Sequence, residues 1–177
     1  EDHSLELRAD RPEGEAGAPS LHLAFTSIAW REAWKYGERA FRYCQLDMGH
    51  VLGAVASAAG PPGWRPRLLS MAPAELDARL GLDRVDDYAG VETEAAEVML
   101  ALSGATEPPL FTRWHGRPGL LDPRPMHTWP VIDEVTEATR GRLPCHPLEG
   151  GEAGEAVAAA TIPPEVLLRR RSAQAFD

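Results

Sequence analysis

The spacing of apolar positions predicts one long amphipathic helix in the first third of the chain. Over residues 30–59, large apolar side chains recur four or seven residues apart, at positions 30, 34, 41, 48 and 55. This spacing is typical of a helix with a broad buried face. Thr26 or Ser27 would cap its start, and the Gly-Pro-Pro-Gly sequence at 60–63 would end it. We expect a continuous central helix whose weakest point is at residues 47–49.

Shorter segments complete a pattern of separated strands and helices. Alternating or uniformly apolar runs predict strands, and a leading proline or a closing glycine predicts the ends of helices. Strands are expected at residues 4–9, 21–28 and 97–103, and helices at 73–82, at 129–140 and from Pro163 or Pro164 onward. Repeated prolines predict an extended arm over residues 104–130, and residues 141–154 resemble a linker. The expected fold class is α+β, with the long helix packed on a small sheet.

Composition and charge limit the classes of function. The formal charge is −9, from 18 basic and 27 acidic residues, which disfavours a general nucleic-acid-binding surface. No apolar run reaches the roughly 20 residues that a membrane helix needs, so no membrane partner is expected. Cys44 and Cys145 make no disulfide framework, which favours the cytoplasm. We expect no metal site, because His50 and Cys44 lack further partners at ligand spacing.

A row of cations lies along the predicted long helix. Arg31, Lys35, Arg39 and Arg42 fall at helical spacing on one face, and Lys35 is the single lysine of the chain. Like charges at this spacing destabilise an isolated helix slightly, so the row indicates an anionic partner such as a phosphate, a carboxylate or a reduced cofactor. The alternative is a solvated face, on which neighbouring glutamates such as Glu38 offset the cations.

Two tyrosines, Tyr36 and Tyr43, flank these cations seven residues apart. A phenol beside cations loses its proton more readily, because the phenolate is stabilised, and such a group can act as a general acid or base. The alternative is a buried tyrosine that is satisfied by one hydrogen bond. The tyrosines are therefore candidates for proton transfer, with a structural role as the competing interpretation.

Two further features also have two interpretations each. Gly49, Gly53 and Ser57 form a ridge of small side chains that would admit a second helix or a flat ligand, or would only relieve crowding. The basic run at residues 169–172 would make an anion site from guanidinium groups and a hydroxyl, or would be a solvated helix end.

The segment AWREAWKYGERAFRYCQLDMGHVLGAVASAAG resembles the nitroreductase superfamily, most closely its SagB/ThcOx-type dehydrogenase branch. That branch shows a K-Y-x-x-R motif, an R-Y pair, a Gly-His pair and an Ala-rich helix. Here the motifs read Lys35 to Arg39, Arg42-Tyr43 and Gly49-His50. The segments DHSLELR, ELDARLGLD and EVMLALSG are also similar to family segments, so the resemblance covers roughly residues 2–104.

The resemblance implies a nitroreductase-like fold and an FMN-dependent oxidoreductase that transfers hydride between flavin and an organic substrate. Lys35 and Tyr36 match the pair assigned to catalysis in azoline-oxidising members, where a base removes a proton while hydride passes to the flavin. Arg39 is expected to contribute to the flavin site. The implied partners are a small-molecule or peptide-heterocycle substrate and a second lobe, in a homodimer or an internal pseudo-dimer.

The closing LRRRSAQAFD looks like the R-R-S-x-R-x-F motif that opens a nitroreductase domain and binds the flavin phosphate. By that resemblance, Arg170, Arg171 and Ser172 would bind the phosphate, although Gln174 replaces the third arginine of the motif. An opening motif that follows a closing half indicates the central part of a tandem protein.

Three parts are therefore expected along the chain. Residues 1–104 would be the C-terminal half of one lobe, residues 105–161 a connector with a short helix, and residues 162–177 the start of a second lobe. The alternative function is a non-enzymatic nitroreductase-like pseudo-domain that serves pairing or peptide binding.

Overall fold

A three-stranded antiparallel sheet forms the centre of the computed structural model, which describes residues 4–11, 20–59, 64–103, 107–123, 126–141, 163–169 and 171. The strand order is β2 (Leu21–Ser27), β4 (Ala95–Ser103) and β3 (Arg67–Leu68). The central strand β4 is an almost uninterrupted apolar run, and residues 98–102 are all buried. A run of this kind suits a strand that is covered on both faces.

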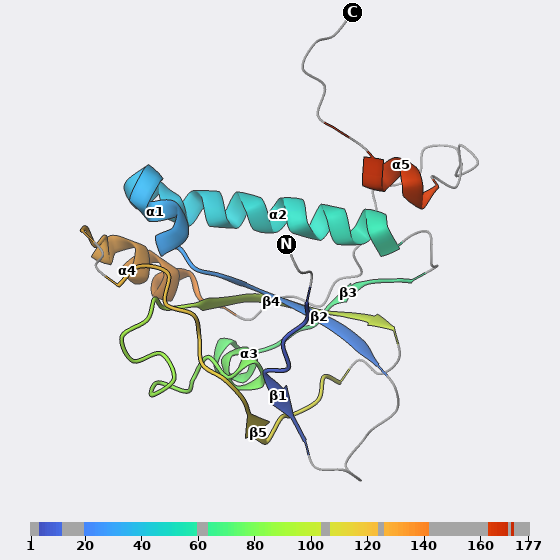
Figure 1. The fold of residues 1–177 in the computed structure, drawn as a ribbon, viewed down its shortest axis with the longest axis horizontal. Helices are drawn as coiled ribbons and strands as arrows, with labels where there is room; N and C mark the ends of the chain where they lie inside the picture. The colour runs from blue at the N-terminus through green and yellow to red at the C-terminus, as the bar shows by residue number, and fades with distance from the viewer. Residues whose placement is uncertain are drawn as a thin grey trace, which may run out of the picture.

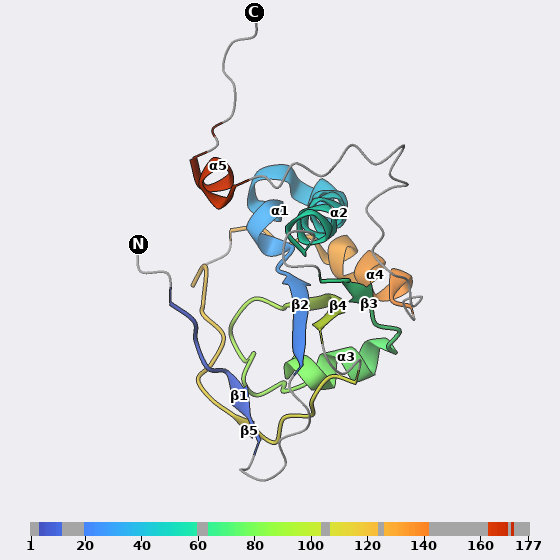
Figure 2. The ribbon, with the colours of Figure 1, turned by 90° about the vertical axis from the view of Figure 1, so that its right-hand side faces the viewer.

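Helices cover both faces of the sheet (Figures 1 and 2). One face carries α1 (Trp30–Tyr36), the 3-10 turn η1 (Gly37–Arg39) and the long α2 (Ala40–Ala59). The other face carries α3 (Pro73–Leu80). The expected class, α+β with a long helix on a small sheet, is confirmed.

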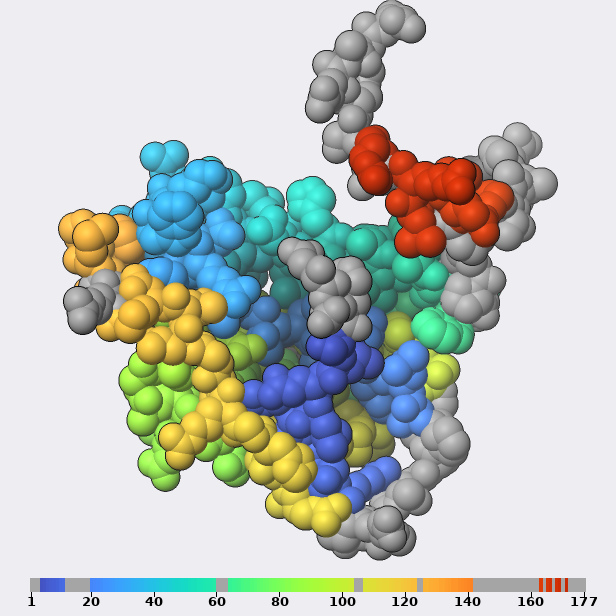
Figure 3. Space-filling model, viewed as in Figure 1, coloured from blue at the N-terminus to red at the C-terminus, as the bar shows by residue number. Residues whose placement is uncertain are grey.

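Two small apolar clusters hold these layers together. Between the sheet and α3 lie Leu69, Met71, Leu76, Met99 and Ala101. A second cluster joins Ala33 of α1, Ala40 of α2 and Ile132 of α4 (Pro130–Thr139). The helix α4, expected within a connector, therefore packs on α1 and on the start of α2, and Figure 3 shows α4 beside α1.

The long helix differs from its prediction at two places. It is interrupted at Gly37, whose φ is 59°, and it is continuous through residues 47–49, so the expected weakest point was wrong. Neither Thr26 nor Ser27 caps its start, because Ala29 occupies the N-cap position. The hydroxyl of Ser27 instead donates to Glu97 Oε1 at 2.5 Å.

The predicted strand at residues 4–9 is mostly absent. Only β1 (Ala9–Asp10) is paired, with β5 (Arg113–Trp114) of the proline-rich arm. Upstream of β1, the side chains of Leu5 and Leu7 are 103% and 66% exposed. The alternation of Leu5 and Leu7 predicts a half-buried strand, but both residues are exposed among the described parts of the chain.

The proline-rich arm is extended over residues 107–123, as predicted, apart from the short strand β5. Arg79 of α3, which is only 7% exposed, binds it by donating to the carbonyl of Pro108 and to Glu107 Oε1. Trp114 lies directly over Gly81, whose φ is 70°, so a Cβ at this position would overlap the indole. Gly81 also ends α3, as the sequence predicted.

The remaining predicted strands and helices that fall in the described residues are present as the predicted type of element. Strands β2 and β4 and helices α3 and α4 lie within a few residues of their expected bounds, and α5 (Pro164–Arg169) begins at a proline. In Figure 1, α5 lies near the C-terminal end of α2, whereas α1 and α4 lie at its other end. The predicted linker at 141–154 lies outside the described residues, apart from Gly141.

Candidate functional site

A cavity lies beneath α1, between α4 and the loop that leads into β4. Its volume is about 660 Å³. Trp30, the first residue of α1, and Trp129, which precedes α4, line it together with smaller apolar side chains such as Ala33 and Ile132. Its charged lining residues are Glu92, Glu94, Asp122, Asp133, Glu137 and Arg140. Aromatic walls with a few charged groups are typical of small-molecule sites.

Two glutamates separate this cavity from a second one. Glu92 accepts hydrogen bonds from the backbone N–H groups of Leu121 and Asp122, at 3.0 and 2.7 Å. Burial raises the pKa of Glu92, but the backbone N–H donors of Leu121, Glu92 and Asp122, and the charge of Arg31, outweigh that effect, so the pKa is lowered. Glu92 therefore remains ionised and attaches the arm to the sheet.

The second glutamate, Glu94, is held by two hydroxyls. Thr26 Oγ1 donates to one of its carboxylate oxygens, and the phenol of Tyr88 lies 3.5 Å from the other. Burial, and then the charge of Glu94, raise the pKa of Tyr88 to about 12. Tyr88 is therefore a hydrogen-bond donor to Glu94 at neutral pH and not a base.

The second cavity, of about 420 Å³, has a mixed lining. Arg8, Arg31 and Arg84 line it together with Glu92 and Glu94. The guanidinium carbon of Arg84 lies 5.6 Å from the centroid of the Trp114 ring, and its Nε lies 2.7 Å from Asp87 Oδ2. The arm over residues 114–121 forms one wall of this cavity.

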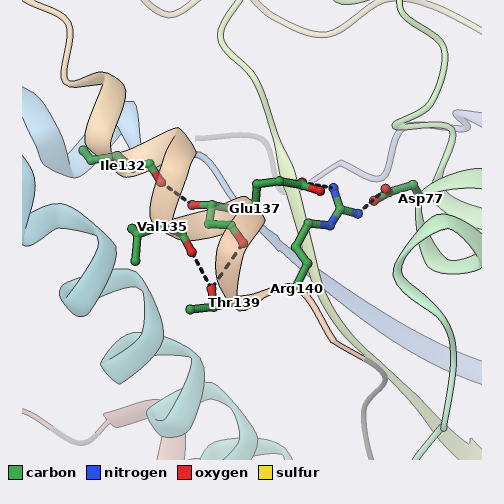
Figure 4. A network of polar contacts seen from close by, with 7 residues as sticks. Asp77, Ile132, Val135, Glu137, Thr139 and Arg140 are labelled. Carbon is green, nitrogen blue, oxygen red and sulfur yellow. Dashed lines mark hydrogen bonds and ion pairs between the residues drawn. The ribbon is translucent and has the colours of Figure 1, made fainter.

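Arg140 closes the far end of the first cavity and also lines a third one of about 340 Å³. Figure 4 shows its guanidinium between Glu137, one turn earlier on α4, and Asp77 of α3. The distance from Arg140 Nη1 to Glu137 Oε2 is 3.7 Å. The third cavity also contains Glu97, which accepts from Gln45 Nε2 at 3.1 Å.

The predicted catalytic pair lies elsewhere, on the outer side of α1. Lys35 Nζ is 4.9 Å from the centroid of the Tyr36 ring, and the rings of Tyr36 and Tyr43 are 4.5 Å apart with 46° between their planes. A hydrogen bond to Tyr36 and the charge of that group raise the pKa of Lys35. Lys35 and Tyr36 are exposed, and neither lines the three cavities.

Gly37 connects these two sides of the helix. Its φ of 59° belongs to the left-handed region that favours glycine, and a Cβ here would lie 3.5 Å from Trp129 Nε1. Gly37, the glycine of the KYGER segment, therefore ends α1 directly after Lys35 and Tyr36, and it lies beside the indole of Trp129 that lines the cavity.

The other predicted residues are dispersed. Arg39 lies in η1 and is exposed. Arg170 and Ser172 lie outside the described residues, and Arg171, which follows α5, is exposed. Around Gly49 and Gly53 there is open space, so no described part of the chain packs on that ridge.

The structure brings no described residues together as a metal centre. Among the described ranges, no group of three or more His, Cys, Asp or Glu side chains could hold a metal ion. Cys44 is buried, and burial followed by the charges of Glu32, Glu97 and Asp47 raises the pKa of its thiol. Within the part of the chain that the structure describes, no helix is both long and apolar enough to span a membrane.

Sequence reasoning missed the cavity beneath α1. Its walls come from residues 27–33, 90–95, 120–123 and 128–140, which no short motif connects. One available signal was the spacing of Glu92, Glu94 and Glu97 where the chain enters an apolar strand. Acidic residues at the start of a buried strand need hydrogen-bond donors or solvent nearby.

Comparisons of the chain with protein-family models, with curated proteins and with solved structures found no match. The resemblance to nitroreductases therefore stays a prediction from the motifs.

Proposed function

We propose that the chain is part of an FMN-dependent oxidoreductase of the nitroreductase type, with Lys35 and Tyr36 at its reaction site. The observation that carries the proposal is the contact of Lys35 with Tyr36, and of Tyr36 with Tyr43, on an exposed surface where Gly37 interrupts the long helix. Cations and aromatic rings together suit a flat, electron-rich ligand.

These residues fit one side of a flavin site. Lys35 and Arg39 would bind an anionic ring system, and FMN, when bound, would accept hydride from the substrate. Tyr36, once its phenol has given up its own proton to solvent, would take the proton that leaves the substrate, and Lys35 Nζ lies 4.9 Å from the centroid of its ring. A second lobe, in a homodimer or an internal pseudo-dimer, would supply the other side of the site.

Flavin binding by the purified full chain tests this proposal. We expect absorbance at about 450 nm after FMN is added and excess cofactor is removed. Lys35→Ala should weaken FMN binding about tenfold, and Arg65→Ala, which removes an exposed cation outside this surface, should not change it. A chain that takes up no FMN at roughly 100 μM would contradict the proposal, since cofactor sites are far tighter than this.

A second candidate function is pairing without catalysis. The observation that favours it is apolar exposure on the same helices: Trp34 is 66% exposed and Leu46 is 60% exposed. Large exposed apolar side chains that cluster mark protein interfaces. If the chain pairs through this surface, Leu46→Asp should reduce the sedimentation coefficient to that of a monomer, whereas Val85→Asp, at a more exposed loop position, should not.

A further inference from the structure

We infer that the cavity beneath α1 binds a small organic cation, an amine or guanidinium group on an apolar body. This inference does not depend on flavin binding, because the cavity and the surface around Lys35 lie on different sides of α1.

The first argument is the size and lining of the cavity. Its volume of about 660 Å³ falls within the range of sites for small organic molecules. Trp30 and Trp129 line it from two different elements, and Ala33 and Ile132 lie at its base in a buried cluster. Such walls favour an apolar or aromatic body over a hydrated inorganic ion.

The second argument is the charge of the lining. The lining contains five carboxylates, and Arg140 is the one cation among the described lining residues. The guanidinium of Arg140 is already shared between Glu137 and Asp77, and Asp77 does not line the cavity. An anionic ligand would meet strong repulsion here, whereas a cation would be attracted from solution.

The third argument is the placement of these carboxylates. Asp133 and Glu137 are one turn apart on α4, and Glu92 and Glu94 enter the same cavity from the loop before β4. The indoles of Trp30 and Trp129 line the cavity with them. A carboxylate beside an aromatic ring is the combination that recognises ammonium and guanidinium groups, through ion pairing and cation–π attraction.

Three probes of one shape test the charge requirement on the full chain. Benzylamine should bind saturably and shift the indole N–H resonances of Trp30 and Trp129, whereas benzyl alcohol and benzoate should bind at least tenfold more weakly. Equal binding of benzyl alcohol, or no binding of benzylamine at about 10 mM, would overturn the inference. Nα-acetyl-arginine amide is a fourth probe. If it binds more tightly than benzylamine, the preferred cation is a peptide side chain; if it binds more weakly, the preferred cation is a free amine.

Matched variants on α4 test the location. Asp133→Asn should weaken benzylamine binding about 3- to 10-fold. Glu134→Gln should not, although it removes the same charge from the adjacent position, because Glu134 does not line the cavity. If the two variants lose the same affinity for benzylamine, the attraction is a general electrostatic one to the acidic chain. That result would overturn the placement of the binding site in this cavity.

Discussion

The two sides of α1 differ in charge, in enclosure and in what the sequence reveals about them. The outer side presents Lys35 with Tyr36 on an open surface, while the inner side lines a half-open cavity with carboxylates and the indoles of Trp30 and Trp129. Lys35 and Tyr36 are adjacent in sequence and line none of the three cavities, whereas the cavity beneath α1 is assembled from distant segments. A motif thus indicates which residues lie together, but tertiary packing decides which surfaces are enclosed.

Gly37 is the point at which the two sides are coupled. Its conformation ends α1 just after the Lys35-Tyr36 pair, and its inner surface contacts Trp129. Trp129 also packs on the cluster of Ala33, Ala40 and Ile132, so its indole lies beside both α1 and the start of α2.

The largest expected effect comes from the buried base of the inner side. Ile132 is 5% exposed and packs with Ala33 and Ala40, so Ile132→Ala should lower the free energy of unfolding by about 2–5 kcal/mol, through lost burial and a cavity. Leu46→Ala, on the exposed outer surface of α2, should change it by less than about 0.5 kcal/mol. Urea unfolding followed by circular dichroism measures both, and similar losses would remove the distinction between a packed and an open side.

The next largest effect is expected at Gly37, which lies between the two sides of α1. Gly37→Ala should destabilise the fold by about 1–3 kcal/mol, because φ near 59° strains a residue with a Cβ. The Cβ itself meets Trp129 only at an ordinary contact distance, so the cost lies in the backbone.

Gly53→Ala is the matched control for Gly37→Ala. Gly53 lies inside α2 with open space around it, so alanine there should stabilise the chain by about 0.5–1 kcal/mol. Urea unfolding again gives both values. If both alanine variants raise the free energy of unfolding, the backbone at position 37 adopts ordinary helical geometry without strain. That result would contradict the need for glycine between α1 and α2.

The sequence predicted elements more successfully than it predicted their junctions. The apolar run of β4 and the Pro73 and Gly81 boundaries of α3 are local signals, and they were read correctly. The break at Gly37 was missed because the residues around it are strong helix formers, and the contact that accompanies the break comes from Trp129, 92 positions later in the numbering. Periodicity carries no information about such a distant partner.

A titration of the tyrosines distinguishes Tyr88, which is bonded to Glu94, from the two tyrosines on the outer side. Tyr88 is one of three tyrosines, and its pKa is about 12, because burial and the charge of Glu94 disfavour the phenolate. The stability that Tyr88 contributes is complete below the unfolded value of about 10 and is lost as the pH rises toward 12.

The ultraviolet titration of folded chain should therefore show one late phenolate component, which Tyr88→Phe removes. Circular dichroism at each pH serves to confirm that the fold persists. A late component that survives in Tyr88→Phe would place the perturbed phenol among the tyrosines of the outer side.

The smallest effect concerns the attachment of the arm to the inner side. The pKa of Glu92 is lowered, because the hydrogen bonds from its backbone donors outweigh desolvation. The stability that Glu92 contributes is therefore fully present above the unfolded pKa of about 4.3, and it is lost as the pH falls through the folded pKa. Acidification should speed amide hydrogen exchange at Leu121 and Asp122, after correction for the intrinsic pH dependence of exchange. Glu92→Gln should flatten that response, and Glu107→Gln, on the same arm but bound to Arg79, should leave it unchanged. An unchanged response in Glu92→Gln would mean that the carboxylate between the two cavities does not hold the arm, and that packing of Trp114 on Gly81 is sufficient.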